Sequence, residues 1–146
     1  MLIGILSSCS TIYSRMAYNF ERLDSPHNIY FEIGSEDLAQ YVNKTIDKLI
    51  VDVEKEQFKS FNSVDEIKVF VFSNKERYSN YSQASDKTRG SAMTNEIYIS
   101  PIIRGRVETL PSILTHELSH IDIRQYIGSW NYINYIPGCF LEGLAV

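Results

Sequence analysis

Apolar residues recur at intervals of three and four between residues 38 and 53, with charged and amide side chains between them. This spacing predicts an amphipathic helix that runs from about residue 36 to about Lys59. Ser35 suits the N-cap position, and Glu36 and Asp37 favour the positive end of the helix dipole. The positions that form the expected buried face are Leu38, Val42, Ile46, Leu49, Ile50 and Val53.

Three stretches have the patterns that are typical of strands. Polar and apolar residues alternate over residues 28–33, which predicts a first strand. Residues 67–73 are mainly β-branched or aromatic, as expected of a central strand that is buried on both faces. A third strand is expected at residues 95–100. Between the second and third strands we expect a short helix over residues 75–81. A polar loop through residues 85–91 follows, and we interpret it either as a surface excursion or as a lid over a substrate.

A second amphipathic helix is predicted over residues 112–126. Pro111 and Ser112 are typical of a helix start, with Ser112 as the expected N-cap, and Gly128 is a suitable stop. The aromatic stretch 129–136 is expected to pack the connection to a last short helix at residues 139–145. The apolar stripe of the second helix consists of Ile113, Leu114, Leu118, Ile121 and Ile123.

Length, composition and charge limit the classes of protein that fit. The 146 residues suit one domain large enough to bury a core, and 44% hydrophobic with 22% charged residues is typical of an ordered globular chain. The net charge of −4 argues against a nucleic-acid partner, which requires a basic face. Two cysteines, Cys9 and Cys139, provide neither a disulfide framework nor a cysteine-based zinc site. No run approaches the roughly 18 apolar residues of a membrane-spanning helix.

The second predicted helix carries the candidate chemistry. His116 and His120 are four residues apart, so a helix places both imidazoles on one face, where they can share a metal ion. Catalytic zinc usually takes three protein ligands and keeps one position open for water, and Glu142 is the natural third ligand. Glu117 is placed to deprotonate that water. The pattern predicts a site with one Zn²⁺ ion per chain and hydrolysis of peptide bonds.

The motif His116-Glu117-Leu118-Ser119-His120, followed by Glu142-Gly143-Leu144-Ala145, resembles the gluzincin zinc metallopeptidases and, more narrowly, the bacterial peptidase MA-like families. The resemblance implies that His116, His120 and Glu142 bind zinc and that Glu117 is the general base. It also implies that the strand at residues 95–100 lines the cleft. The backbone of Ile97, Tyr98 and Ile99 is then expected to hold an extended peptide or protein substrate by strand addition.

The fold implied by the resemblance is α+β: a zincin-like catalytic domain in which a small twisted sheet packs on the helix at 36–59 and on the motif helix. Two features depart from the family pattern. Cys139 stands where the family usually has tryptophan. The sequence also ends at Val146, soon after Glu142, whereas gluzincins continue into further helices. We therefore expect residues 18–146 to form a zincin-like peptidase domain that is incomplete at its C-terminus. The alternative is a zinc-binding but inactive, truncated or degenerate relative that acts as a binding module.

Residues 1–17 are treated as a separate N-terminal segment. Leu6-Ser7-Ser8-Cys9 resembles the lipobox of bacterial lipoproteins, in which the cysteine is lipidated, but no Lys or Arg precedes Arg15. Two interpretations stay open. Either the segment is a lipoprotein signal and tether, which would anchor the protein to the membrane of the bacterial cell envelope through Cys9, or it is an apolar strand with a buried thiol in a cytoplasmic or secreted protein.

Overall fold

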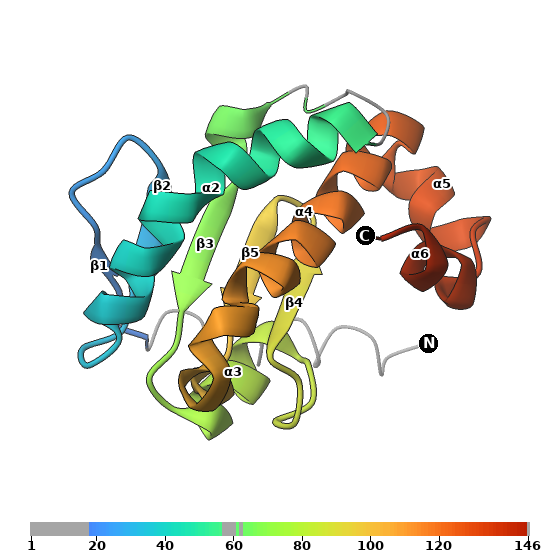
Figure 1. The fold of residues 1–146 in the computed structure, drawn as a ribbon. Helices are drawn as coiled ribbons and strands as arrows, with labels where there is room; N and C mark the ends of the chain where they lie inside the picture. Colours follow the sequence, from blue (N-terminus) through green and yellow to red (C-terminus); the bar gives the residue numbers. More distant parts are fainter. Residues whose placement is uncertain (1–17, 57–60, 62, 146) are drawn as a thin grey trace.

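A mixed five-stranded sheet with helices on both faces forms the body of the protein in a computed structural model, which describes residues 18–56, 61 and 63–145. Figure 1 shows α2 and α4 lying across the front of the sheet and α3 at its lower end. The elements in chain order are β1 (Glu21–Arg22), β2 (Asn28–Phe31), α2 (Glu36–Glu56), η1 (Val64–Glu66), β3 (Lys68–Val71), α3 (Lys75–Ser82), β4 (Gly90–Met93), β5 (Glu96–Ile99), η2 (Pro101–Thr109), α4 (Leu110–Ile127), α5 (Ser129–Asn134) and α6 (Gly138–Leu144).

The strands are arranged in the order β1-β2-β3-β5-β4. The three central strands are parallel to one another, whereas β1 and β4 pair antiparallel at the two ends. One row of paired residues crosses the sheet from Phe31 through Val71 and Ile99 to Gly90. Among the described residues β4 is the outermost strand at one end of the sheet, and it packs against α4. Its outer edge is therefore open to pairing with a further strand beside α4.

The two faces of the sheet have different side chains because successive residues of a strand point to opposite sides. Aliphatic residues such as Val69 and Val71 face α2 and α4 and belong to the larger core. Aromatic residues face the other side, where Phe70 and Phe72 pack with Tyr81 of α3. The prediction of a central strand buried on both faces within residues 67–73 is confirmed, although the strand itself covers only Lys68–Val71.

The long helix α2 confirms the pattern from which it was predicted, since all six of its expected core positions are buried. Its described part ends at Glu56, and residues 57–60, which include the expected end at Lys59, lie outside the described residues. The hydroxyl of Ser35 lies 2.7 Å from the carbonyl oxygen of Glu32 and 3.0 Å from that of Val71. Ser35 therefore attaches the start of α2 to the sheet.

Three local predictions are corrected. Residues 90 and 91 do not belong to a loop, because β4 begins at Gly90 and forms a hairpin with β5. The motif helix begins at Leu110, two residues earlier than expected. Thr109 occupies its N-cap position, so Ser112 lies inside the first turn and cannot cap it. Gly128 ends this helix with φ of +81°, as predicted.

The observed architecture agrees with the expected α+β class. The finer assignment to a zincin-like fold, and with it the division of the chain at residue 18, stays a prediction. None of the helices in the described ranges combines the length and the apolar character that crossing a bilayer requires.

Candidate metal centre

Helix α4 places its motif residues between the core and a cleft. Leu114, Leu118 and Ile121 are buried in the core beneath α2, which fixes the rotation of the helix about its axis. His116 and His120 therefore emerge on a different side, one turn apart, and remain partly accessible. The apolar stripe that was predicted for this helix thus determines the direction of the histidines.

Three side chains converge at this place. Nε2 of His116 lies 3.2 Å from Nε2 of His120. The carboxylate of Glu142, on α6, places one oxygen 3.3 Å from His116 Nε2 and the other 3.5 Å from His120 Nε2. One ligand atom from each of the three residues lies within 4.8 Å of the other two. Among the described residues, these His and Glu side chains are the group found close enough together to hold a metal ion. The structure thus brings together the three residues that the sequence predicts as metal ligands.

The geometry fits a zinc ion. Zn²⁺ binds histidine nitrogen and carboxylate oxygen at about 2.0–2.2 Å in a tetrahedral arrangement, which requires ligand atoms about 3.3–3.6 Å apart. The two histidine nitrogens, 3.2 Å apart, are close to this requirement, and each has a different oxygen of the Glu142 carboxylate at a similar distance, 3.3 Å from His116 and 3.5 Å from His120. Two nitrogens and one oxygen also form a donor set that zinc commonly uses, with a fourth position left for water.

Glu117 lies beside the three ligands but is held differently. The residue is almost completely buried, with an exposed fraction of 7%, whereas the side chain of Glu142 is 66% exposed. Burial, and secondly the nearby carboxylate of Glu142, raises the pKa of Glu117 from 4.5 to about 7. A carboxyl group with a pKa near neutrality can exchange a proton at physiological pH, which a general base must do.

Burial also affects the histidine that lies deeper. It lowers the pKa of His120, and the proximity of His116 lowers it further. A histidine binds a metal ion only in its neutral form, so a lowered pKa favours the state that metal binding requires.

The cleft is formed between α4 and the edge strand β4. A cavity of about 350 Å³ is lined by Thr88, Gly90, Ser91, Ala92, His116, Glu117, His120, Tyr132 and Glu142. Gly90 allows this close approach, because a Cβ atom at that position would lie 2.6 Å from Cγ2 of Ile113 and 3.3 Å from Oε1 of Glu117. The absence of a side chain at Gly90 brings the backbone of β4 against the carboxyl group of Glu117.

This arrangement corrects the predicted substrate strand. β5 pairs with β3 on one side and with β4 on the other, so no edge of it is open to a peptide. Ile97, Tyr98 and Ile99 are completely buried, and their side chains pack in the two cores. β4 has the position beside the ligands that was expected of β5.

The aromatic stretch after α4 also differs from its prediction. Trp130, Ile133 and Tyr135 are 69% to 72% exposed, so these side chains do not pack the connection. Tyr132, on the same short helix, is half-buried and turns toward the metal centre. Its hydroxyl oxygen lies 3.2 Å from Nδ1 of His120, and the guanidinium carbon of Arg124 lies 4.4 Å from the centre of its ring.

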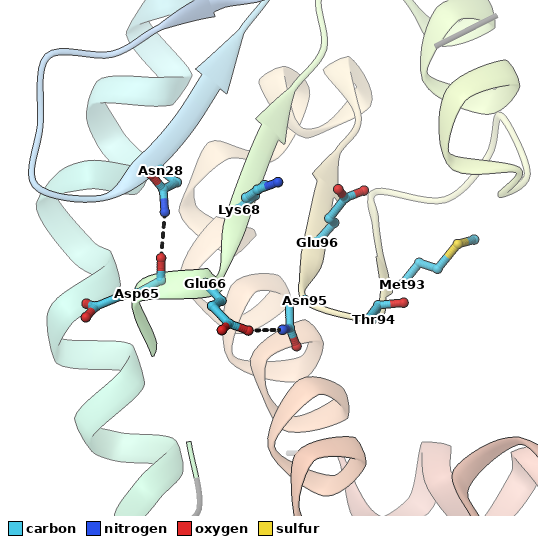
Figure 2. Close-up of a pocket in the computed structure, with 8 residues that line it drawn as sticks. All are labelled: Asn28, Asp65, Glu66, Lys68, Met93, Thr94, Asn95 and Glu96. Atoms are coloured by element: carbon cyan, nitrogen blue, oxygen red, sulfur yellow. Dashed lines mark hydrogen bonds between the residues drawn. The ribbon is translucent and has the colours of Figure 1, made fainter. Parts of the chain in front are cut away.

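A larger cavity, of about 590 Å³, lies at the end of the sheet where β3 and β5 begin (Figure 2). Its polar side chains are partly paired among themselves, since Asn28 donates to the carbonyl oxygen of Asp65 and Asn95 donates to Glu66. It contains no histidine or cysteine among its lining residues, which are Asn28, Asp65, Glu66, Lys68, Met93, Thr94, Asn95 and Glu96. The smaller cavity, with its ligand set and its buried carboxyl group, is the better candidate site.

Sequence reasoning missed two residues of this site. Gly90 lies in the stretch that was predicted as a polar loop. The sequence contains one indication that it approaches the motif helix, which is that this loop leads into the strand before that helix. Tyr132 was missed because nothing in the aromatic stretch 129–136 distinguishes it from Tyr135, and their difference arises from the way α5 folds back on α4. Cys9 lies outside the described residues, as does the side chain of Cys139.

Comparisons with protein-family models, curated proteins and solved structures gave no match to this chain.

Proposed function

We propose that this chain is a zinc-dependent metallopeptidase of the gluzincin type, which hydrolyses peptide bonds. The observation that carries the proposal is the convergence of His116, His120 and Glu142 at separations suited to one zinc ion, with the carboxyl group of Glu117 buried next to them. A metal centre alone would need only the three ligands. The additional buried carboxyl group, with its raised pKa, supports hydrolysis.

The roles of the residues follow from their places in the site. His116, His120 and Glu142 would hold Zn²⁺, which supplies a Lewis acid that polarises the scissile carbonyl group and lowers the pKa of a bound water. Glu117 takes up a proton from the attacking water and returns it to the nitrogen of the departing amine. Its burial excludes bulk water, which would otherwise compete for that proton.

The edge of β4 supports an extended peptide as the substrate. The amide nitrogen of Ser100 donates to the carbonyl oxygen of Arg89 at 2.9 Å, which identifies this pair as hydrogen-bonded in the antiparallel ladder. Such pairs alternate along the ladder, so the backbone polar groups of Gly90 and Ala92 point away from β5. A peptide that pairs with these groups would lie along the cavity that contains the metal ligands.

The first test is the zinc content of the purified protein. We expect about one zinc ion per chain in the wild type and a marked loss in Glu142→Ala, because one of three ligands is removed. Glu108→Ala is the matched control, since Glu108 is an exposed glutamate away from the site. Absence of zinc from the wild type, even after zinc is added back, would refute the metal centre.

The second test separates binding from hydrolysis. Glu117→Gln keeps the size of the side chain and leaves all three ligands in place, so it should retain zinc while peptide cleavage is lost. Undiminished turnover in this variant would remove Glu117 from the base role. A wild-type protein that binds zinc but cleaves no peptide in a broad substrate screen would favour the binding-module alternative.

We also propose that the enzyme acts at the bacterial cell envelope, tethered by a lipid on Cys9. The proposal is supported by Leu6-Ser7-Ser8-Cys9, in which small residues precede a cysteine after an apolar run. Expression in a bacterial host with a labelled fatty acid should give a labelled protein, and Cys9→Ser should abolish the label. Cys139→Ser is the control for labelling at the other cysteine, and an unlabelled wild type would contradict the tether.

A further inference from the structure

The imidazole ring of His120 has a neighbour at each of its nitrogens. Nε2 faces the metal centre, at 3.2 Å from Nε2 of His116 and 3.5 Å from Glu142. Nδ1 faces the opposite way and lies 3.2 Å from the hydroxyl oxygen of Tyr132. Tyr132 is thus the residue that contacts the side of His120 directed away from the ligands.

We propose that Tyr132 is a positioning residue: it accepts a hydrogen bond from Nδ1 of His120 and so keeps Nε2 of His120 free to bind the metal ion. The inference rests on the zinc site of the proposed function. A neutral imidazole carries one proton, and binding through Nε2 requires that this proton be on Nδ1. An acceptor at Nδ1 therefore selects the binding tautomer and fixes the orientation of the ring.

Tyr132 is itself held in place by the end of α4. The guanidinium carbon of Arg124 lies 4.4 Å from the centre of the Tyr132 ring, which is within the range of a cation–π interaction. Arg124 follows His120 by four residues, so both side chains project from the same side of the helix. The amide nitrogen of Tyr132 also donates to the carbonyl oxygen of Gly128 at 3.0 Å. The orientation of His120 is therefore coupled to the fold of the segment that follows α4.

The hydroxyl group of Tyr132 remains neutral in this position. Burial raises its pKa above 10, although the guanidinium of Arg124 acts in the opposite direction. A neutral hydroxyl can accept the hydrogen bond from His120 through its oxygen and still donate its own proton elsewhere. Tyr135 offers a contrast three residues later, because its side chain is 72% exposed and contacts solvent.

The test uses Tyr132→Phe, which removes one oxygen atom and retains the ring, with Tyr135→Phe as the matched control. The first measurement is the tautomer of His120 in the metal-free protein at pH 8, from ¹H–¹⁵N correlations of the imidazole rings. Only three histidines must be assigned, which the variants His27→Gln and His120→Gln accomplish. We expect the Nδ1–H tautomer in the wild type and in Tyr135→Phe, and a shift toward Nε2–H in Tyr132→Phe.

The second measurement is the affinity for Zn²⁺, by competition with a chromophoric chelator. Loss of an outer partner of a ligating histidine typically weakens metal binding about 10- to 100-fold, and we expect a loss of this size in Tyr132→Phe alone. An unchanged tautomer with unchanged affinity would overturn the proposal. So would unchanged affinity with a fall in kcat, which would assign Tyr132 to the substrate instead. If the wild type binds no zinc, the proposed function fails, while the tautomer still decides whether Tyr132 orients His120.

Discussion

Oε1 of Glu117 lies so close to the backbone of Gly90 that a Cβ atom on Gly90 would approach it to 3.3 Å. The same Cβ would lie 2.6 Å from Cγ2 of Ile113, a distance that real Cβ contacts essentially never show. Two elements of different kinds, an edge strand and the motif helix, therefore meet where the smallest residue faces the proposed general base. Glu117 is buried at this meeting point, and burial is the main cause of its raised pKa.

Gly90→Ala should lower the free energy of unfolding by about 1–3 kcal/mol, because a methyl group must be accommodated in a packed interface. Ile113 or the strand has to move, and Glu117 moves with them. We expect peptide turnover to fall while zinc is retained, since the three atoms nearest to the added Cβ belong to Ile113 and Glu117 and to none of the proposed metal ligands. Urea unfolding, zinc content and kcat measure the three effects.

Gly105→Ala is the control for this substitution. Nothing lies within 4 Å of the Cβ position at Gly105, and the residue is exposed in η2. The same chemical change should therefore leave stability and turnover nearly unchanged. If both substitutions change stability and turnover equally, the close packing at Gly90 is not the cause of the effects of Gly90→Ala.

The raised pKa of Glu117 predicts how the stability of the metal-free protein depends on pH. The folded state binds the proton of Glu117 up to about pH 7, whereas the unfolded state releases it near 4.5. The folded state thus holds more protons between these values, so the free energy of unfolding falls as pH rises through this window. Across the whole window the free energy of unfolding should fall by about 3 kcal/mol, at roughly 1.4 kcal/mol for each pH unit.

Glu117→Gln removes this titration and should make the metal-free protein more stable than the wild type. The difference should be small at pH 4.5 and should grow to about 3 kcal/mol at pH 8. Urea unfolding at several pH values in the presence of a chelator provides the measurement. Glu108→Gln, at an exposed position, should show no such trend. A constant difference between wild type and Glu117→Gln across the range would contradict the raised pKa.

The sequence predicted those parts of the fold that depend on local periodicity. The buried face of α2 and the central strand β3 follow from the spacing of Leu38 to Val53 and from the run of β-branched and aromatic residues at 67–73. The pairing of His116 and His120 follows from helical geometry alone. The convergence of Glu142 with them could be predicted only from the motif, because α5 and α6 have to bring it back to α4.

The sequence failed where long-range pairing decides the structure. β4 reads Gly-Ser-Ala-Met, with no β-branched residue, and becomes a strand because β5 beside it supplies a ladder. The resemblance to gluzincins gave the substrate to the strand before the motif helix, and because β4 was not predicted, that role fell on Ile97 to Ile99 of an inner strand. The error was therefore in the order of the strands, which local pattern does not determine.

The outward direction of the backbone at Ala92 predicts that a proline there will affect the substrate more than the fold. Proline removes the amide proton that would donate to a peptide paired with β4, while the ladder to β5 uses the neighbouring residues. One lost hydrogen bond corresponds to about 0.5–1.5 kcal/mol, so KM should rise by about 2- to 10-fold. Zinc content should be unchanged.

Ser91→Pro is the matched comparison, because the amide of Ser91 faces β5 and its loss breaks the ladder. This variant should be markedly less stable in urea unfolding. If Ala92→Pro leaves KM unchanged in a protein that remains folded, the peptide does not pair with the edge of β4.

The hairpin between β4 and β5 contains a strained residue. Met93 pairs with Glu96, so Thr94 and Asn95 alone form the turn, and Thr94 has φ of +57°. A β-branched residue rarely adopts this conformation, which glycine adopts without steric cost. Thr94→Gly should therefore raise the free energy of unfolding by about 1 kcal/mol, which urea unfolding can measure. Thr94→Ala removes the same hydroxyl group, an acceptor for Arg124 at 3.4 Å, but keeps a Cβ atom. If the alanine variant gains as much stability as the glycine variant, backbone strain at Thr94 is not the cause.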